Sequence, residues 1–451
     1  MTKKVAIIVD DIVRDLIPLT LLAIELHRKN LKPYLVPARL QVLEIRKIKP
    51  DFIIINYLRK ENEEIVQYYK NSGVAVGLLD QEGGAFIDYQ KFEEIKLSKN
   101  LELRNSIDLV FAWGENFYNE ARKRLWFKED SLIITGHPKY DIYFKKNKNI
   151  NKKAAKFLFI TGFTLGNPRL QTKDKELKTW VKMGGDFNYV KELQNKHEVS
   201  YLKFINLLED IFTKYPDKEF LLKIHPFEKS EGYIEKFKKY QNVEIIVSEN
   251  IINSLPDSKI MFHSSSTTAF ESILYDVPTA NIDFLNNPFN IEILNNISIN
   301  LESQKELEEL LETDNYELLQ NKTKESKKII RNYFGDFLGD SSKLIAEKIF
   351  VFLKNNEVEV NKNINKNQLV TSITNSKTLL MIKKLLFSFG LPEDFSFRKM
   401  TSQYTLWKQE EAKYFDNNTL VDYLKNFDLE FDVYNFEKAE KKSVSLTIKN
   451  E

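Results

Sequence analysis

Short runs of apolar residues alternate with longer amphipathic stretches along most of this chain. In the first third, a continuous apolar run indicates a strand that is buried on both faces, and such strands belong to parallel sheets covered by crossover helices. The runs lie at residues 5–9, 33–36, 52–55, 74–79, 109–112 and 132–135, and the stretch 16–29 predicts one of the helices. The pattern predicts a doubly wound α/β domain.

A lysine- and asparagine-rich stretch at residues 145–156 interrupts the alternation, which then restarts. Further strands are predicted at 157–161, 220–224, 243–247, 259–262 and 279–282, with helices at 199–215, 265–274 and within 303–353. We therefore expect two Rossmann-like, doubly wound domains in tandem, at residues 1–148 and 149–355. Ligands of such sheets bind beyond the carboxyl ends of the strands.

A C-terminal extension, residues 356–451, does not continue the alternation, and its role does not follow from the pattern. Within it, residues 379–391 are apolar and basic. This stretch either packs on the body of the protein or lies on a membrane surface with its lysines outward.

The composition of the chain excludes several classes of function. Among 451 residues, 67 are basic and 65 acidic, so the net charge of +2 gives no general attraction for nucleic acid. The absence of cysteine excludes disulfides, thiol catalysis and cysteine-bound zinc, and no histidine spacing fits a metal site. No apolar run is long enough to span a bilayer, and no signal-peptide pattern precedes the first strand. We expect a cytoplasmic protein, with at most peripheral contact at the inner face of the membrane.

A His225-Pro226 pair follows the predicted strand at 220–224. Proline cannot donate a ladder hydrogen bond, so it ends the strand and holds the imidazole at the edge of the sheet. There, a histidine can donate to a phosphate oxygen or protonate a leaving group. Lys223, two residues earlier, points to the same side. The alternative is a histidine that only caps the turn.

A cluster of five hydroxyl residues follows the strand at 259–262 and opens a helix. The cluster comprises Ser264, Ser265, Ser266, Thr267 and Thr268. A helix N-terminus attracts phosphate, and Glu271 on the second turn is placed to accept hydrogen bonds from ribose hydroxyls. An ordinary helix cap explains one of the five hydroxyls but not all of them. The cluster therefore predicts a nucleotide-binding site.

An acidic turn, Asp80-Gln81-Glu82-Gly83-Gly84, follows the strand at 74–79. Glycines let the backbone turn sharply, and the carboxylates of Asp80 and Glu82 are candidates for a general base or a nucleophile at a sugar carbon. The alternative is a plain turn with solvated charges.

Two further segments follow predicted strands. Residues 136–141 form either a structural turn or a substrate contact, and Gly162 in the loop 161–167 permits close approach of the backbone to a ligand. The loop lacks both the dinucleotide fingerprint and the phosphate-loop lysine motif, which excludes a dehydrogenase or a P-loop enzyme.

Together, these motifs resemble bacterial surface-polysaccharide glycosyltransferases of the GT-B fold that use CMP-activated acidic sugars, such as sialyltransferases and Kdo transferases. The resemblance covers about residues 5–350 and extends to surface carbohydrate biosynthesis proteins. It implies that Glu82 beside Gly83 supplies the base, and that His225, Pro226 and Ser265, Ser266 or Thr267 bind CMP.

The chain departs from the family at Gln81, which stands where the first acidic residue of the turn is expected. Asp80 or Glu82 must then act as the base; in a retaining transfer, Asp141 becomes a candidate nucleophile. This departure also motivates an alternative, a catalytically inactive scaffold subunit of polysaccharide assembly.

We therefore expect a metal-independent transferase that moves an ulosonic acid from a CMP-sugar to a glycan or glycolipid acceptor. The CMP-sugar is the donor substrate, and no separate cofactor is implied. Lys139, Lys223 or Arg169 would pair with the carboxylate of the sugar. The enzymatic alternative is a polyol-phosphate transferase of the CDP-glycerol type.

Overall fold

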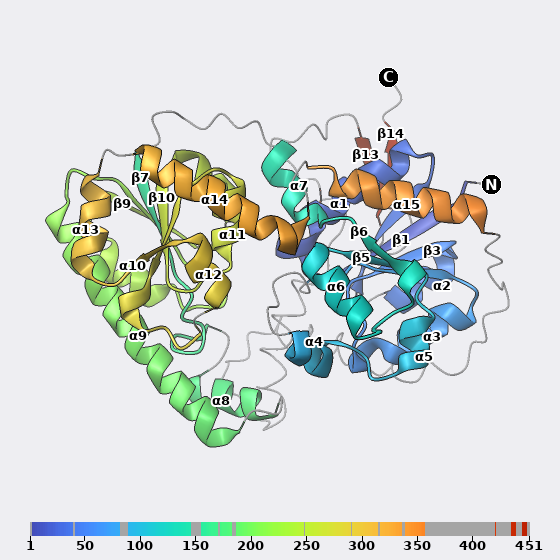
Figure 1. Ribbon diagram of the computed structural model, residues 1–451, viewed down its shortest axis with the longest axis horizontal. Coiled ribbons are helices and arrows are strands. Elements are labelled where there is room, and N and C mark those ends of the chain that lie inside the picture. Colours follow the sequence, from blue (N-terminus) through green and yellow to red (C-terminus); the bar gives the residue numbers. More distant parts are fainter. Residues whose placement is uncertain are drawn as a thin grey trace, which may run out of the picture.

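The computed structural model contains two α/β domains (Figure 1). The structure describes residues 2–38, 41–81, 89–145, 155–169, 172–182, 186–247, 249–289, 291–313, 316–335, 339–356, 420, 434–438 and 444–448. This arrangement confirms the predicted pair of doubly wound domains.

The first domain is built on six parallel strands in the order β2-β1-β3-β4-β5-β6. These strands are β1 (Lys4–Val9), β2 (Lys32–Pro37), β3 (Phe52–Ile55), β4 (Ala75–Leu78), β5 (Leu109–Ala112) and β6 (Leu132–Ile134). The helices are α1 (Ile12–Arg28), α2 (Gln41–Ile48), α3 (Glu63–Asn71), α4 (Tyr89–Lys96), α5 (Leu101–Asn105), α6 (Glu115–Lys123) and α7 (Pro138–Lys145).

The second domain has six parallel strands in the order β12-β11-β10-β7-β8-β9. They are β7 (Lys156–Ile160), β8 (Phe220–Lys223), β9 (Val243–Ile246), β10 (Ser258–His263), β11 (Thr279–Ile282) and β12 (Ile299–Leu301). The helices are α8 (Lys173–Lys182), α9 (Phe187–Lys214), α10 (Glu231–Phe237), α11 (Thr268–Leu274), α12 (Glu292–Ile297), α13 (Gln304–Glu312) and α14 (Tyr316–Phe334). Short 3-10 helices lie at Lys60–Asn62, Glu129–Ser131, Ile251–Asn253, Leu255–Asp257 and Asp283–Leu285.

Both faces of the first sheet are buried, as the continuous apolar runs predict. In β1, Val5 and Ile7 join one apolar cluster while Ala6 and Ile8 join another, because successive side chains of a strand point to opposite faces. All four side chains are at most 1% exposed. The packing on both faces places the polar residues of the first domain at the ends of its strands.

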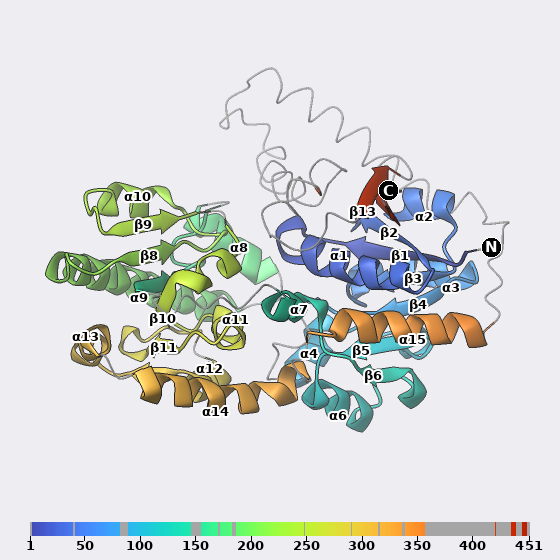
Figure 2. The same ribbon diagram turned by 90° about the horizontal axis from the view of Figure 1, so that it is seen from above.

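After the second domain, the chain returns to the first (Figure 2). Helix α15 (Ser341–Asn355), which the sequence assigned to the second domain, packs against α1 and α7. A hairpin of β13 (Tyr434–Lys438) and β14 (Val444–Ile448) from the C-terminal extension pairs antiparallel with β2 and extends the first sheet to eight strands. Residues 379–391 lie outside the described residues. No helix in the described part of the chain is both long and apolar enough to cross a bilayer.

Aromatic residues pack where the two domains meet. Phe334 is the last residue of α14. Its ring centroid lies 4.8 Å from the ring centroid of Tyr140 in α7 and 4.7 Å from that of Phe270 in α11. The backbone of Tyr333 approaches Gly114, where a Cβ atom would come within 2.6 Å of it. This packing joins α11, which follows the hydroxyl cluster, to the start of α7 in the first domain.

Candidate functional site

The His225-Pro226 turn is tied to the neighbouring strand. The His225 amide donates to Oγ1 of Thr161, at the end of β7, over 2.8 Å. The Nδ1 atom of His225 accepts the amide of Phe227 at 3.2 Å, so the proton of the neutral ring is on Nε2. Burial, with the nearby Lys223 charge, lowers the pKa of His225 to about 4. Near neutral pH the side chain is therefore a neutral hydrogen-bond donor and only rarely an imidazolium acid.

The hydroxyl cluster forms a tight turn between β10 and α11. Ser265 has a positive φ of 56°, and its amide donates to Oδ1 of Asn281 over 3.0 Å. The Ser266 hydroxyl donates to Oγ1 of Thr268 at 3.1 Å. Thr267, at the N-cap position of α11, makes no side-chain capping bond, while Ser264 is buried. Thr267 therefore does not cap α11, whereas the Ser266 hydroxyl oxygen accepts the Thr268 amide at 3.3 Å, so a cap explains one hydroxyl of the cluster and not all five.

Strand order brings these turns together at one edge of the second sheet. Strands β8 and β10 flank β7, and because neighbouring strands lie about 4.8 Å apart, their carboxyl ends are separated by roughly 10 Å. The loop after β7 lies between them. A Cβ atom at Gly162 would meet nothing within 4 Å, whereas one at Gly166 would come within 2.9 Å of the α9 backbone. Gly162 thus faces open space, and Gly166 serves helix packing.

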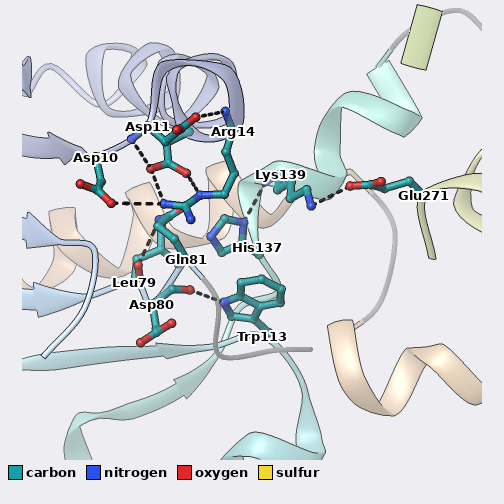
Figure 3. Close-up of polar contacts among 11 residues, drawn as sticks. Asp10, Asp11, Arg14, Leu79, Asp80, Gln81, Trp113, His137, Lys139 and Glu271 are labelled. Atoms are coloured by element: carbon teal, nitrogen blue, oxygen red, sulfur yellow. Dashed lines mark hydrogen bonds and ion pairs between the residues drawn. The ribbon is translucent and has the colours of Figure 1, made fainter. Parts of the chain in front are cut away.

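Glu271 is held by the first domain (Figure 3). Its Oε1 atom lies 2.6 Å from Nζ of Lys139, which belongs to α7. Burial alone would lower the pKa of Lys139, but the Glu271 carboxylate raises it above its ordinary value. The charge of Glu271 also acts on Lys223, whose pKa is lowered by burial in spite of Glu249 and Glu271. The charge of Glu271 in α11 therefore interacts both with Lys139 of the first domain and with Lys223 at the end of β8.

The acidic turn is only partly described. Asp80 and Gln81 are buried at the end of β4. The Asp80 carbonyl accepts Nε1–H of Trp113 at 2.7 Å, and the Gln81 amide group donates to the carbonyl of Leu79 at 3.0 Å (Figure 3). Glu82, Gly83 and Gly84 lie outside the described residues, so the base at Glu82 stays a prediction.

An acidic group after β1 was missed in the sequence. Arg14 donates to Oδ2 of Asp15 at 2.9 Å. Its guanidinium group also lies 3.7 Å from Oδ2 of Asp10 (Figure 3). Asp11 caps α1 by accepting the Arg14 amide. Burial raises the pKa of Asp15. The pair of aspartates directly after the strand at 5–9 was the available signal.

Both carboxylate oxygens of Asp141 accept backbone amides. Its Oδ1 accepts the amide of Ser341 at 3.0 Å and its Oδ2 that of Ser342 at 2.7 Å, at the start of α15. The side chain is buried. This geometry does not support the expected role of Asp141 as a nucleophile, because both oxygens already bond to the helix start.

His137-Pro138 repeats the geometry of His225-Pro226 in the first domain. Nδ1 of His137 accepts the amide of Lys139 at 3.0 Å, and the ring lies 4.4 Å from that of Trp113. Burial, with the Lys139 and Arg14 charges, lowers the pKa of His137. The turn therefore holds Lys139 in front of Glu271. His263 likewise accepts a backbone amide through Nδ1, that of Ser266 at 3.2 Å, and contacts Ser298 Oγ through Nε2, so it helps to hold the hydroxyl turn in place.

A second residue missed in the sequence is Glu228, which is 1% exposed. It accepts the Phe163 amide at 2.8 Å and the Tyr233 hydroxyl at 2.6 Å. Burial raises its pKa to about 7 against these hydrogen bonds. Its position three residues after His225 was the only signal in the sequence. Among the described residues, no group of three or more His, Asp or Glu side chains is arranged to hold a metal ion.

Comparison with solved structures agrees with this architecture. The S. aureus MnaA–UDP structure matches with a TM-score of 0.52 and 16% identity, covering 78% of this chain and 97% of that one. A UDP-N-acetylglucosamine 2-epimerase structure matches with a TM-score of 0.51 and 16% identity, covering 79% and 98%. No family model and no curated protein sequence matches the chain. Identities this low establish the fold alone, which is GT-B-like as expected.

Proposed function

We propose that the protein is a glycosyltransferase that moves an ulosonic acid, such as Kdo or a sialic acid, from a CMP-sugar to a surface glycan. The observation that carries the proposal is the meeting of three loops at one edge of the second sheet. These are the turn at His225, the loop at Gly162 and the hydroxyl turn at Ser265, with Glu271 in the first turn of α11. Fold neighbours whose names carry UDP or a UDP-sugar favour a nucleotide or nucleotide-sugar ligand.

The residues at this edge suit one phosphate group. His225 donates through Nε2–H, while the hydroxyls of Thr267 and Thr268 provide further donors. Lys223 adds positive charge, and Glu271 accepts from the ribose. Fixed donors of this kind stabilise the charge that develops on a departing phosphate. CMP carries a single phosphate, so the transfer needs no metal ion if these donors neutralise the phosphate charge.

The first domain receives the acceptor. An acceptor hydroxyl gives its proton to a carboxylate of the acidic turn, Asp80 or Glu82, and its oxygen forms a bond to the anomeric carbon. The bond between that carbon and the phosphate oxygen breaks, and CMP leaves with the electron pair. Gln81 cannot act as the base, because its amide does not titrate and donates to its own backbone.

Calorimetry with CMP, CDP and UDP tests the nucleotide. We expect CMP to bind in the micromolar range, and His225→Ala to weaken binding by at least tenfold. His27→Ala, in the last turn of α1, is the control and should bind as the wild type does. Failure of the wild-type protein to bind CMP would overturn the proposal.

Product analysis tests the reaction. Incubation with a CMP-ulosonic acid and an acceptor glycan is expected to form a ketosidic linkage and release CMP. A phosphodiester product from CDP-glycerol would instead establish the polyol-phosphate transferase, and binding without turnover would indicate the scaffold subunit.

A further inference from the structure

The two loops that flank the predicted phosphate site are joined by one buried carboxylate. Oε1 of Glu228 accepts the amide of Phe163, in the loop after β7, and Oε2 accepts the hydroxyl of Tyr233, in α10. Glu228 itself follows the His225-Pro226 turn. A single side chain thus connects the loop after β7, the turn after β8 and the helix that follows it.

Backbone contacts reinforce this connection. The Glu228 amide donates to the carbonyl of His225 at 2.9 Å, and the Arg169 amide donates to the carbonyl of Phe227 at 2.9 Å. The side-chain amide of Asn167 donates to the carbonyl of Lys229 at 3.0 Å. The loop 161–169 and the turn 225–229 therefore form one hydrogen-bonded unit, and Glu228 lies buried within it.

A carboxyl group is a costly choice for this position. Burying a carboxylate is unfavourable unless hydrogen bonds compensate for lost hydration. Burial raises the pKa of Glu228 to about 7, which shows how far the surroundings oppose its charge. What the carboxyl group supplies, and an apolar side chain cannot, is two acceptors that fix the neighbouring loop and helix.

We propose that Glu228 is a positioning residue, which holds the Gly162 loop against the His225 turn so that both can contact the nucleotide phosphate. This inference rests on the proposed nucleotide site. Glu228 does not touch the ligand; it acts through the Phe163 amide and through its own backbone contact with His225.

Three variants test the proposal by calorimetry with CMP. Glu228→Ala is expected to weaken binding by tenfold or more, since the loop loses its acceptor. Glu228→Gln should stay within about threefold of wild type, because its carbonyl oxygen still accepts the Phe163 amide. Glu231→Ala, an exposed carboxylate three residues further on, is the matched control and should bind normally. Equal losses in the Ala and Gln variants would overturn the proposal.

Amide hydrogen exchange gives a second readout that needs no ligand and so does not depend on the proposed function. In Glu228→Ala, exchange at Phe163 and His225 is expected to accelerate together, with no change in Glu231→Ala. If Glu228→Ala does not fold, Tyr233→Phe removes one hydrogen bond and keeps the ring, and the same two amides should accelerate. Unchanged protection at both amides in the folded variant would refute the role of Glu228. Failure of the wild-type protein to bind CMP, with this exchange result intact, would refute only the proposed function.

Discussion

The protonation of Glu228 should make stability depend on pH. Its pKa in the native protein is about 7, above the ordinary value of 4.5, so the native state binds more protons than the unfolded state between these values. The free energy of unfolding should therefore fall as pH rises from about 4.5 to 7, by on the order of 3 kcal/mol. Urea unfolding at pH 5 and pH 7.5 measures the change. Glu228→Gln should remove this contribution and Glu231→Gln should keep it; the same pH dependence in both variants would contradict the assignment.

The tautomer of His225 is also testable without a ligand. The Phe227 amide donates to Nδ1, and burial lowers the pKa to about 4, so the ring should be neutral with its proton on Nε2 at pH 5.5. Long-range ¹H–¹⁵N NMR spectra distinguish this tautomer from the imidazolium. The chain has five histidines, so loss of one signal in His225→Ala assigns it. A charged ring at pH 5.5 would refute the proposed neutral donor.

The position of a single residue could be predicted from the sequence where its neighbours in space are also its neighbours along the chain. The placement of His225 and the hydroxyl cluster at strand ends follows from the strand pattern, and the structure has both after β8 and β10. The partner of Glu271 could not be foreseen, because Lys139 is far away in the chain and meets it only through the contact between domains. Glu228 is similar, since its burial depends on the Phe163 loop.

At the scale of elements, Asp141 is expected to stabilise the start of α15. It supplies the cap from another part of the chain, while Asp340, at the N-cap position, makes no side-chain capping bond. Asp141→Ala should lower the free energy of unfolding by about 1–3 kcal/mol because two amides lose a charged acceptor. Asp340→Ala is the matched control, with little expected change. If urea unfolding showed that Asp340→Ala destabilises the protein more than Asp141→Ala does, this role of Asp141 would be contradicted.

Elements were predicted well where hydrophobic pattern alone decides their type. The run at 5–9 became Lys4–Val9 because a strand covered on both faces needs continuous apolar residues. The hairpin Tyr434–Lys438 and Val444–Ile448 was missed, since its pairing with β2 depends on a partner some 400 positions earlier. The position of α15 was missed for a related reason: an amphipathic helix fits the surface of either domain.

At the scale of the whole molecule, the contact between domains combines aromatic packing with one ion pair. Phe334 lies between Tyr140 and Phe270, and Lys139 meets Glu271 beside them. The aromatic rings supply non-directional burial, whereas the ion pair fixes which residues of α7 and α11 face one another. The relative placement of the domains and the orientation of Glu271 are thus set by the same contact.

The ion pair is therefore expected to couple stability to nucleotide binding. Lys139→Glu places two carboxylates together and should both destabilise the protein and weaken CMP binding by at least tenfold. The exchanged pair Lys139→Glu with Glu271→Lys should recover about 1–2 kcal/mol of stability, because opposite charges again face each other across the domains. It should not recover CMP binding, since a lysine replaces the acceptor for the ribose. Urea unfolding and calorimetry on both single variants and the double variant complete the cycle. If CMP binding returns with stability, Glu271 serves only to hold the domains together, and the ribose must bind elsewhere.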